Sequence, residues 1–167
     1  ISPVEIVLRA QEQVDSELKR LQRRIRFEDS EDEVLTRLAR LWREDFLPTS
    51  EKVIARIEDS PMKPVSWKEV QLYLPEVVED IKVLELNGSA GDALEYENHS
   101  ETGLNVIAVG GDKLSRGLTL EGLTISYFLR SSRMYDTLMQ MGRWFGYKPG
   151  YLDLCRLYTT SDLHDWY

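Results

Sequence analysis

Four short apolar segments in the second half of the chain constrain its fold more than any other feature. They read IKVLEL (81–86), NVIAVG (105–110), LTISYFL (123–129) and YLDLCRLYT (151–159). Each has the length and composition of a buried strand, and the segments between them leave room for helices. Strands that alternate with helices favour a mainly parallel sheet flanked by helices. We therefore predict an α/β fold, in which ligands bind at the carboxyl ends of the strands.

The first half of the chain predicts helices. A helix is expected over 3–27, because Ser2 and Glu5 have the spacing of a capping box and Pro3 suits a first turn. A second helix is expected to open at Ser30 and end before Pro48, and a third to cover 50–58. Further helices are predicted from Ser66 to Asp80 and from Arg133 to Phe145. The apolar stripe of the first helix consists of Val7, Val14, Leu18, Leu21 and Ile25, which lie on one face at helical spacing.

Composition limits the classes of partner and chemistry. The net charge of −8 over 167 residues argues against a generally basic nucleic-acid binder, so contacts with phosphate are expected to be local. One cysteine (Cys155) and two histidines (His99 and His164) provide no metal-ligand cluster of familiar spacing, so no metal site is predicted. Apolar runs are too short to span a membrane, which predicts a cytoplasmic protein without a membrane partner. The start at Ile1 and the end at Tyr167 indicate a fragment of a longer protein.

Two segments carry unusual residues. In VGGDKLSRGLTLEGL (109–123), the pair Gly110-Gly111 permits positive φ and close approach of the backbone to a ligand. The alternative is a glycine-rich turn between strands, with an ion pair on its surface. In QMGRWFGYKPGY (140–151), Arg143 stands beside Trp144 among small residues. The alternative there is a surface cation–π pair.

Together these segments resemble motifs V and VI of superfamily 2 helicases, over the continuous run IAVGGDKLSRGLTLEGLTISYFLRSSRMYDTLMQMGRWFGYKPGY. More narrowly, the chain resembles the Z1 domain family, endonuclease-type domains attached to superfamily 2 helicase-like ATPases of bacteria. The resemblance implies a second RecA-like lobe with a helical insertion. Residues 1–26 would form its first helix, 27–64 the insertion, and 65–167 the remaining α/β lobe. Motif V would cover 109–123 and motif VI 140–147.

The resemblance also implies roles for single residues. Motif VI supplies the catalytic pair Gln140 and Arg143, with Arg143 as the arginine finger and Arg116 and Lys148 as alternatives. Nucleotide contacts fall on Arg116, Gly117 and Thr119, where Thr119 replaces an aspartate of the family pattern. Nucleic-acid contacts fall on Gly111, Lys113, Ser115, Arg130 and Arg133. Arg116 and Arg143 are expected at the same end of the sheet and partly exposed.

The implied function is that of the C-terminal RecA-like lobe of a superfamily 2 helicase-type, ATP-dependent DNA-processing protein, of a bacterial defence or restriction type. Its cofactors would be ATP and Mg²⁺, and its partners DNA and an N-terminal RecA-like lobe. The chain has no G-x-x-x-x-G-K-[ST] and no acidic box after an apolar strand, so the ligands of Mg²⁺ are expected outside it. The chain alone is therefore expected to lack ATPase activity.

Two other functions stay open. The first is a metal-dependent endonuclease acting on DNA, for which EDIKVLE offers Asp80, Lys82 and Glu85, with Glu95, Glu97 and His99 as further polar residues. The second is a non-enzymatic interaction module, in which the helices over 3–58 bind another protein. The sequence leaves oligomeric state, translocation polarity and DNA specificity undetermined.

Overall fold

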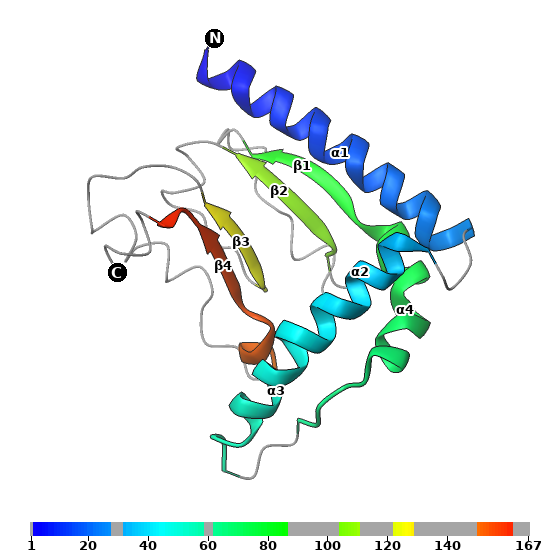
Figure 1. Cartoon of the computed structure of the whole chain (residues 1–167). Coiled ribbons are helices and arrows are strands. Elements are labelled where there is room, and N and C mark those ends of the chain that lie inside the picture. Colours follow the sequence, from blue (N-terminus) through cyan, green and yellow to red (C-terminus); the bar gives the residue numbers. More distant parts are fainter. Residues whose placement is uncertain are drawn as a thin grey trace. The chain divides into compact units, whose positions relative to one another are not determined.

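The protein combines helices with short parallel strands, as expected for an α/β chain (Figure 1). The computed structural model describes residues 2–27, 32–58, 62–86, 104–110, 122–128 and 150–161. The chain forms two compact units, the first made of 1–40 and 66–118, the second of 41–65 and 119–167. In the described part of each unit, the strands form one pair. The predicted domain boundaries at 26 and 64 and the RecA-like lobe itself stay predictions.

The strand pair of unit 1 consists of β1 (Lys82–Leu86) and β2 (Val106–Gly110). The two strands are parallel, with a register that runs from Lys82 beside Val106 to Leu86 beside Gly110. Both strands begin one residue later than the sequence predicts and end where it predicts. Their carboxyl ends therefore lie side by side at one edge of the sheet.

Helix α1 (Pro3–Phe27) packs against both strands and has the predicted bounds. Ser2 accepts a hydrogen bond from the backbone N–H of Glu5, at 3.2 Å, as expected for a residue at the helix start. The predicted apolar stripe is at least half-buried along its whole length, and Leu18 is its fully buried member. The periodicity therefore identified the face of α1 that is turned towards the protein.

Helix α4 (Trp67–Asp80) also packs against α1. The predicted capping box is confirmed, because the Ser66 hydroxyl accepts from the N–H of Glu69, and the Glu69 carboxylate accepts from the N–H of Ser66. At the other end of α4, the side-chain amide of Gln22 donates to the carbonyls of Val78 (2.8 Å) and Ile81 (3.4 Å). The Val78 carbonyl also accepts from the N–H of Ile81 at 3.4 Å, so Gln22 adds a second donor there and connects α1 to the end of α4.

The helical segment over 33–54 differs from the prediction. It consists of α2 (Glu33–Leu41), a π-helical turn η1 (Trp42–Phe46) and α3 (Leu47–Ile54) without a break. The predicted opening at Ser30 is wrong: Asp32 is not helical, and its carboxylate accepts from the N–H of Val34 at 2.6 Å. The predicted stop before Pro48 is also wrong. The wider π turn precedes Pro48 and makes room for a ring that would clash inside a regular α-helix.

The strand pair of unit 2 consists of β3 (Ile125–Phe128) and β4 (Arg156–Thr159), again parallel. Ile125 lies beside Arg156 and Phe128 beside Thr159. The predicted fourth strand is too long, since its first part forms the 3₁₀ turn η3 (Leu152–Leu154). The N–H of Leu154 donates to the carbonyl of Tyr151 at 3.0 Å, which closes that turn.

Two further predictions concern other parts of the chain. The helix predicted from Arg133 to Phe145 lies outside the described residues. Among the residues that the structure describes, no helix has both the length and the apolar character needed to cross a membrane.

Candidate functional site

The carboxyl edge of β1 and β2 is the place from which the glycine-rich segment departs. Gly110 ends β2 beside Leu86 of β1, and the next residue in the chain is Gly111. Ligands of parallel α/β sheets bind at such an edge. The predicted contacts in this segment lie outside the described residues, and they stay predictions: Gly111, Lys113, Ser115, Arg116, Gly117 and Thr119.

The carboxyl end of β3 is the place from which the chain runs on towards the second unusual segment, 140–151. Phe128 ends β3, and Arg130 and Arg133 follow within five residues of the chain. Gln140 and Arg143 come later in the connection between β3 and β4. These four residues also lie outside the described part, so the predicted approach of Arg143 to Arg116 stays a prediction.

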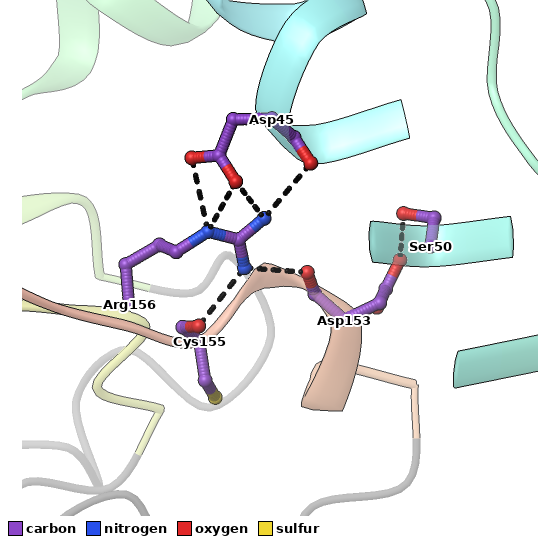
Figure 2. Close-up of polar contacts among 5 residues, drawn as sticks. All are labelled: Asp45, Ser50, Asp153, Cys155 and Arg156. Atoms are coloured by element: carbon purple, nitrogen blue, oxygen red, sulfur yellow. Dashed lines mark hydrogen bonds and ion pairs between the residues drawn. The ribbon is translucent and has the colours of Figure 1, made fainter. Parts of the chain in front are cut away.

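The best-defined polar cluster of the described residues surrounds Arg156, the first residue of β4 (Figure 2). Its Nε donates to both carboxylate oxygens of Asp45 at 3.1 Å, and its Nη2 lies 3.0 Å from Oδ1 of the same group. Its Nη1 donates to the carbonyls of Asp153 and Cys155, each at 2.9 Å. All three guanidinium nitrogens are therefore engaged within unit 2. Arg156 holds β4 to the π turn that carries Asp45, and it has little capacity left for a ligand.

Aromatic rings complete this cluster. The Arg156 guanidinium carbon lies 4.4 Å from the centroid of the Phe46 ring, a cation–π distance. The rings of Phe46 and Trp42 stack with centroids 5.6 Å apart, and the indole N–H of Trp42 donates to the carbonyl of Val65 at 3.0 Å. The π turn is thus fixed by contacts with the strand on one side and with the segment around Val65 on the other.

Ser50 and Cys155 lie next to this cluster without forming a nucleophilic site. The Ser50 hydroxyl donates to the Asp153 carboxylate at 2.5 Å, and Ser50 is only 4% exposed. A substrate therefore has no access to that hydroxyl. The pKa of the Cys155 thiol is raised, chiefly by burial, which disfavours the reactive thiolate.

Of the residues proposed for a nuclease, the structure describes Asp80, Lys82 and Glu85. Asp80 is the last residue of α4, whereas Lys82 and Glu85 belong to β1, three positions apart. Side chains alternate along a strand, so Lys82 and Glu85 point to opposite faces. Within the described ranges, no group of three or more His, Cys, Asp or Glu side chains could hold a metal ion. Glu95, Glu97 and His99 lie outside those ranges.

A groove of about 530 Å³ runs between α1 and α4 in unit 1. Cationic side chains of α1 line it beside an exposed aromatic ring and two residues of α4. The lining residues are Lys19, Gln22, Arg23, Arg26, Phe27, Pro75 and Glu79. This groove combines positive charge with apolar surface, and the sequence prediction did not include it.

The model of the Z1 domain family matches residues 5–167, almost the whole chain. The chain belongs to the Z1 domain family. The family predicted from the motifs is thereby confirmed, and membership is consistent with a nuclease-type function. No curated protein and no solved structure matches the chain.

For this Z1 domain, sequence reasoning missed the contacts of Arg156. One signal for them exists in the sequence: an arginine stands within the apolar segment YLDLCRLYT, where a charged side chain needs a partner. The identity of that partner could not be read in the same way, because Asp45 is 111 residues distant.

Proposed function

We propose that this Z1 domain is the C-terminal RecA-like lobe of a superfamily 2 helicase-type, ATP-dependent DNA-processing protein of a bacterial defence or restriction type. The observation that carries the proposal is the parallel pairing of β1 with β2 and of β3 with β4. The carboxyl end of β2 leads directly into the segment that resembles motif V. The carboxyl end of β3 leads into the segment that precedes the motif VI residues.

In the proposed mechanism, ATP binds between this lobe and an N-terminal lobe that holds Mg²⁺. ATP with Mg²⁺ supplies the phosphoryl transfer that drives movement on DNA. Arg143, beside Gln140, stabilises negative charge that develops on the transferring phosphate. Arg116, Gly117 and Thr119 face the nucleotide. The DNA backbone is contacted by Gly111, Lys113, Ser115, Arg130 and Arg133.

The test is the ATPase activity of the longer protein that carries this domain beside a P-loop lobe. Arg143→Ala should lower ATP turnover by roughly 10³-fold while nucleotide affinity changes little, since a finger acts mainly in the transition state. Arg143→Lys should rescue poorly, because a point charge does not reproduce the guanidinium fork. Arg56→Ala, at an exposed arginine without an assigned role, is the control and should spare basal turnover. Near-normal turnover in Arg143→Ala contradicts the assigned role of Arg143.

A second measurement concerns the 167-residue chain by itself. It should show no ATP hydrolysis, because neither the phosphate cradle nor the acidic box occurs in its sequence. Robust ATP turnover by the purified chain would refute the proposal that it is one lobe of a two-lobe ATPase. Incubation of the same chain with plasmid DNA and Mg²⁺ tests the nuclease alternative that family membership keeps open, and cleavage there would favour it.

A further inference from the structure

The groove in unit 1 lies along a cationic face of an acidic protein. The ten residues 18–27 include five basic residues and no acidic one, in a chain with a net charge of −8. Three of these basic residues, Lys19, Arg23 and Arg26, line the groove. Their spacing of four and three residues keeps them on one face of α1, over a length of about 10 Å. A cationic stripe of this kind fits an extended polyanion.

Salt bridges at the groove do not close it to such a ligand. Arg26 pairs with Glu79 at 2.7 Å, but their side chains are 57% and 61% exposed. Lys19 pairs with Asp15 at 2.6 Å and is 67% exposed. Pairs as exposed as these contribute at most about 1 kcal/mol, so a phosphate can replace the carboxylate as the partner of the cation. The Nε of Arg23 donates to the Lys19 carbonyl at a long distance, 3.4 Å.

The aromatic ring at the end of the stripe adds a second type of contact. Phe27 is 75% exposed, so its ring is accessible from solvent. The Arg26 guanidinium carbon lies 5.2 Å from the centroid of its ring. With Arg26 at this distance the ring is still largely exposed, which leaves it accessible to a flat partner. Pro75 provides further apolar surface in the same groove.

We propose that this groove binds single-stranded nucleic acid, with phosphates on Lys19, Arg23 and Arg26 and an unpaired base stacked on Phe27. Cations that follow a backbone beside an aromatic platform are the usual means of binding single strands without sequence preference. A duplex offers phosphates but no free base face, and an acidic peptide offers carboxylates but no base. The proposal rests on the proposed function only in taking DNA as the ligand, and it uses none of the motif V or motif VI residues.

The experiment measures binding of a fluorescein-labelled oligo(dT) 20-mer to the 167-residue chain over a range of salt concentrations. The double variant Lys19→Ala/Arg23→Ala should reduce the slope of log K against log salt by roughly 1.4, or about 0.7 for each lost phosphate contact on a single strand. Arg9→Ala is the matched control. Arg9 is an exposed arginine on the same helix, paired with Glu5, and lies about 15 Å or more from the groove along the axis.

Two further variants separate the base contact from the charge. Phe27→Ala should weaken binding about 5-fold or more and leave the salt slope unchanged, because stacking involves no ion release. Glu79→Gln should strengthen binding, since it removes a carboxylate that repels phosphate and frees Arg26. Circular dichroism melts of all variants establish that each is folded, which their exposed positions lead us to expect.

The proposal is overturned if the wild-type chain does not bind oligo(dT) at low salt, or if the groove variants bind like Arg9→Ala. Equal affinity for oligo(dT) and a poly-glutamate peptide of matched charge would also overturn it, in favour of an acidic protein partner. Failure here leaves the proposed function standing if Arg143→Ala abolishes ATP turnover in the longer protein. If that variant turns over ATP normally and the groove variants lose oligo(dT) binding, the groove proposal stands and the role proposed for Arg143 is wrong.

Discussion

The two units of the Z1 domain each contain a pair of parallel strands, but the described residues around the two pairs differ in character. In the described part of unit 1, the buried residues are all apolar, beside one ion pair of Arg24 with Asp32, whose side chain is 4% exposed. These buried residues are Leu18, Val34, Leu35, Ala39 and Leu86. In the described part of unit 2, the one buried residue is the polar Ser50, and the guanidinium of Arg156 connects strand to helix. The strand pair of unit 1 thus lies beside mainly apolar buried residues, whereas β4 of unit 2 is held to the helical segment by directed polar contacts.

This difference has consequences for stability. Apolar burial is non-directional and tolerates small shifts, so its loss scales with the volume removed. A hydrogen-bonded arginine requires its partner at a fixed position, and loss of the arginine leaves a carboxylate without its counter-charge. The loss in free energy of unfolding should therefore differ in size between substitutions in the two units. The replacement residues that restore stability should differ as well. Hydrogen exchange followed by mass spectrometry can measure the effect on each unit separately.

The largest effect is expected for Leu86→Ala in β1. Leu86 is 2% exposed, and its truncation leaves a cavity in unit 1. We expect the free energy of unfolding to fall by about 3 kcal/mol, within the usual range for a buried leucine. Chemical denaturation measures the loss, and exchange should accelerate in β1, β2 and α1. Leu72→Ala is the control, because Leu72 is 73% exposed. Equal effects of the two substitutions would contradict the described burial.

A smaller effect is expected for Arg156→Met in β4. The side chain of Arg156 is 13% exposed, whereas that of Asp45 is 37% exposed, so water can partly solvate the carboxylate that remains. We therefore expect a loss of about 2 kcal/mol, less than for a fully buried pair. Arg156→Lys should restore little, since an ammonium cannot make the same set of directed contacts. Arg56→Ala, an exposed arginine of the same unit, should change stability by no more than roughly 0.5 kcal/mol. Full rescue by lysine would show that charge alone matters.

Gln22→Ala tests whether unit 1 also depends on a polar contact. The variant removes the donor for the carbonyls of Val78 and Ile81 at the end of α4. We expect a loss of about 1 kcal/mol, the usual net value of such hydrogen bonds, with faster exchange in the last turn of α4. Gln13→Ala, an exposed glutamine on the same helix, is the control. No difference between the two variants would mean that water replaces the amide without cost.

The smallest effect is expected at the capping box of α4, and it depends on pH. Hydrogen bonds from Ser66 lower the pKa of Glu69 below its ordinary value. A carboxylate with a lowered pKa stabilises the fold above its unfolded pKa, and this contribution disappears as the pH falls through the folded pKa. Ser66→Ala should therefore destabilise the fold at pH 7 by less than any of the substitutions above, and this loss should shrink as the pH falls through the lowered pKa of Glu69. A pH-independent effect in urea titrations would contradict this account.

The features that sequence predicted correctly depend on local signals. The bounds of α1 follow from its capping residues and apolar spacing, and those of α4 from the reciprocal bonds of Ser66 and Glu69. The first three strands are found within about two residues of their predicted ends, because each is a short apolar run bounded by polar residues. Neighbours along the chain determine these features, so a single sequence contains the information.

The features that sequence missed depend on residues far apart in the chain. The contact of Asp45 with Arg156 requires knowledge of which helix lies beside β4, and no periodicity encodes that. The same holds for the groove, whose lining comes from α1 and α4. For the candidate site, the sequence predicted the two strands, β2 and β3, that precede the segments 109–123 and 140–151. The ten residues assigned through the family resemblance lie outside the described part and stay predictions.

The π turn makes the helical segment over 33–54 tolerant of a change in length at one place. The N–H of Leu47 donates to the carbonyl of Trp42, five positions back, where an α-helix would span four. Such a turn amounts to one residue inserted into an α-helix, and the residues beyond it keep the face that they would have without the insertion. A gene that lost one codon between Trp42 and Phe46 could therefore encode a regular helix in which Ser50 still faces Asp153. Asp45 lies inside the turn, so its contact with Arg156 is the one that such a loss would change.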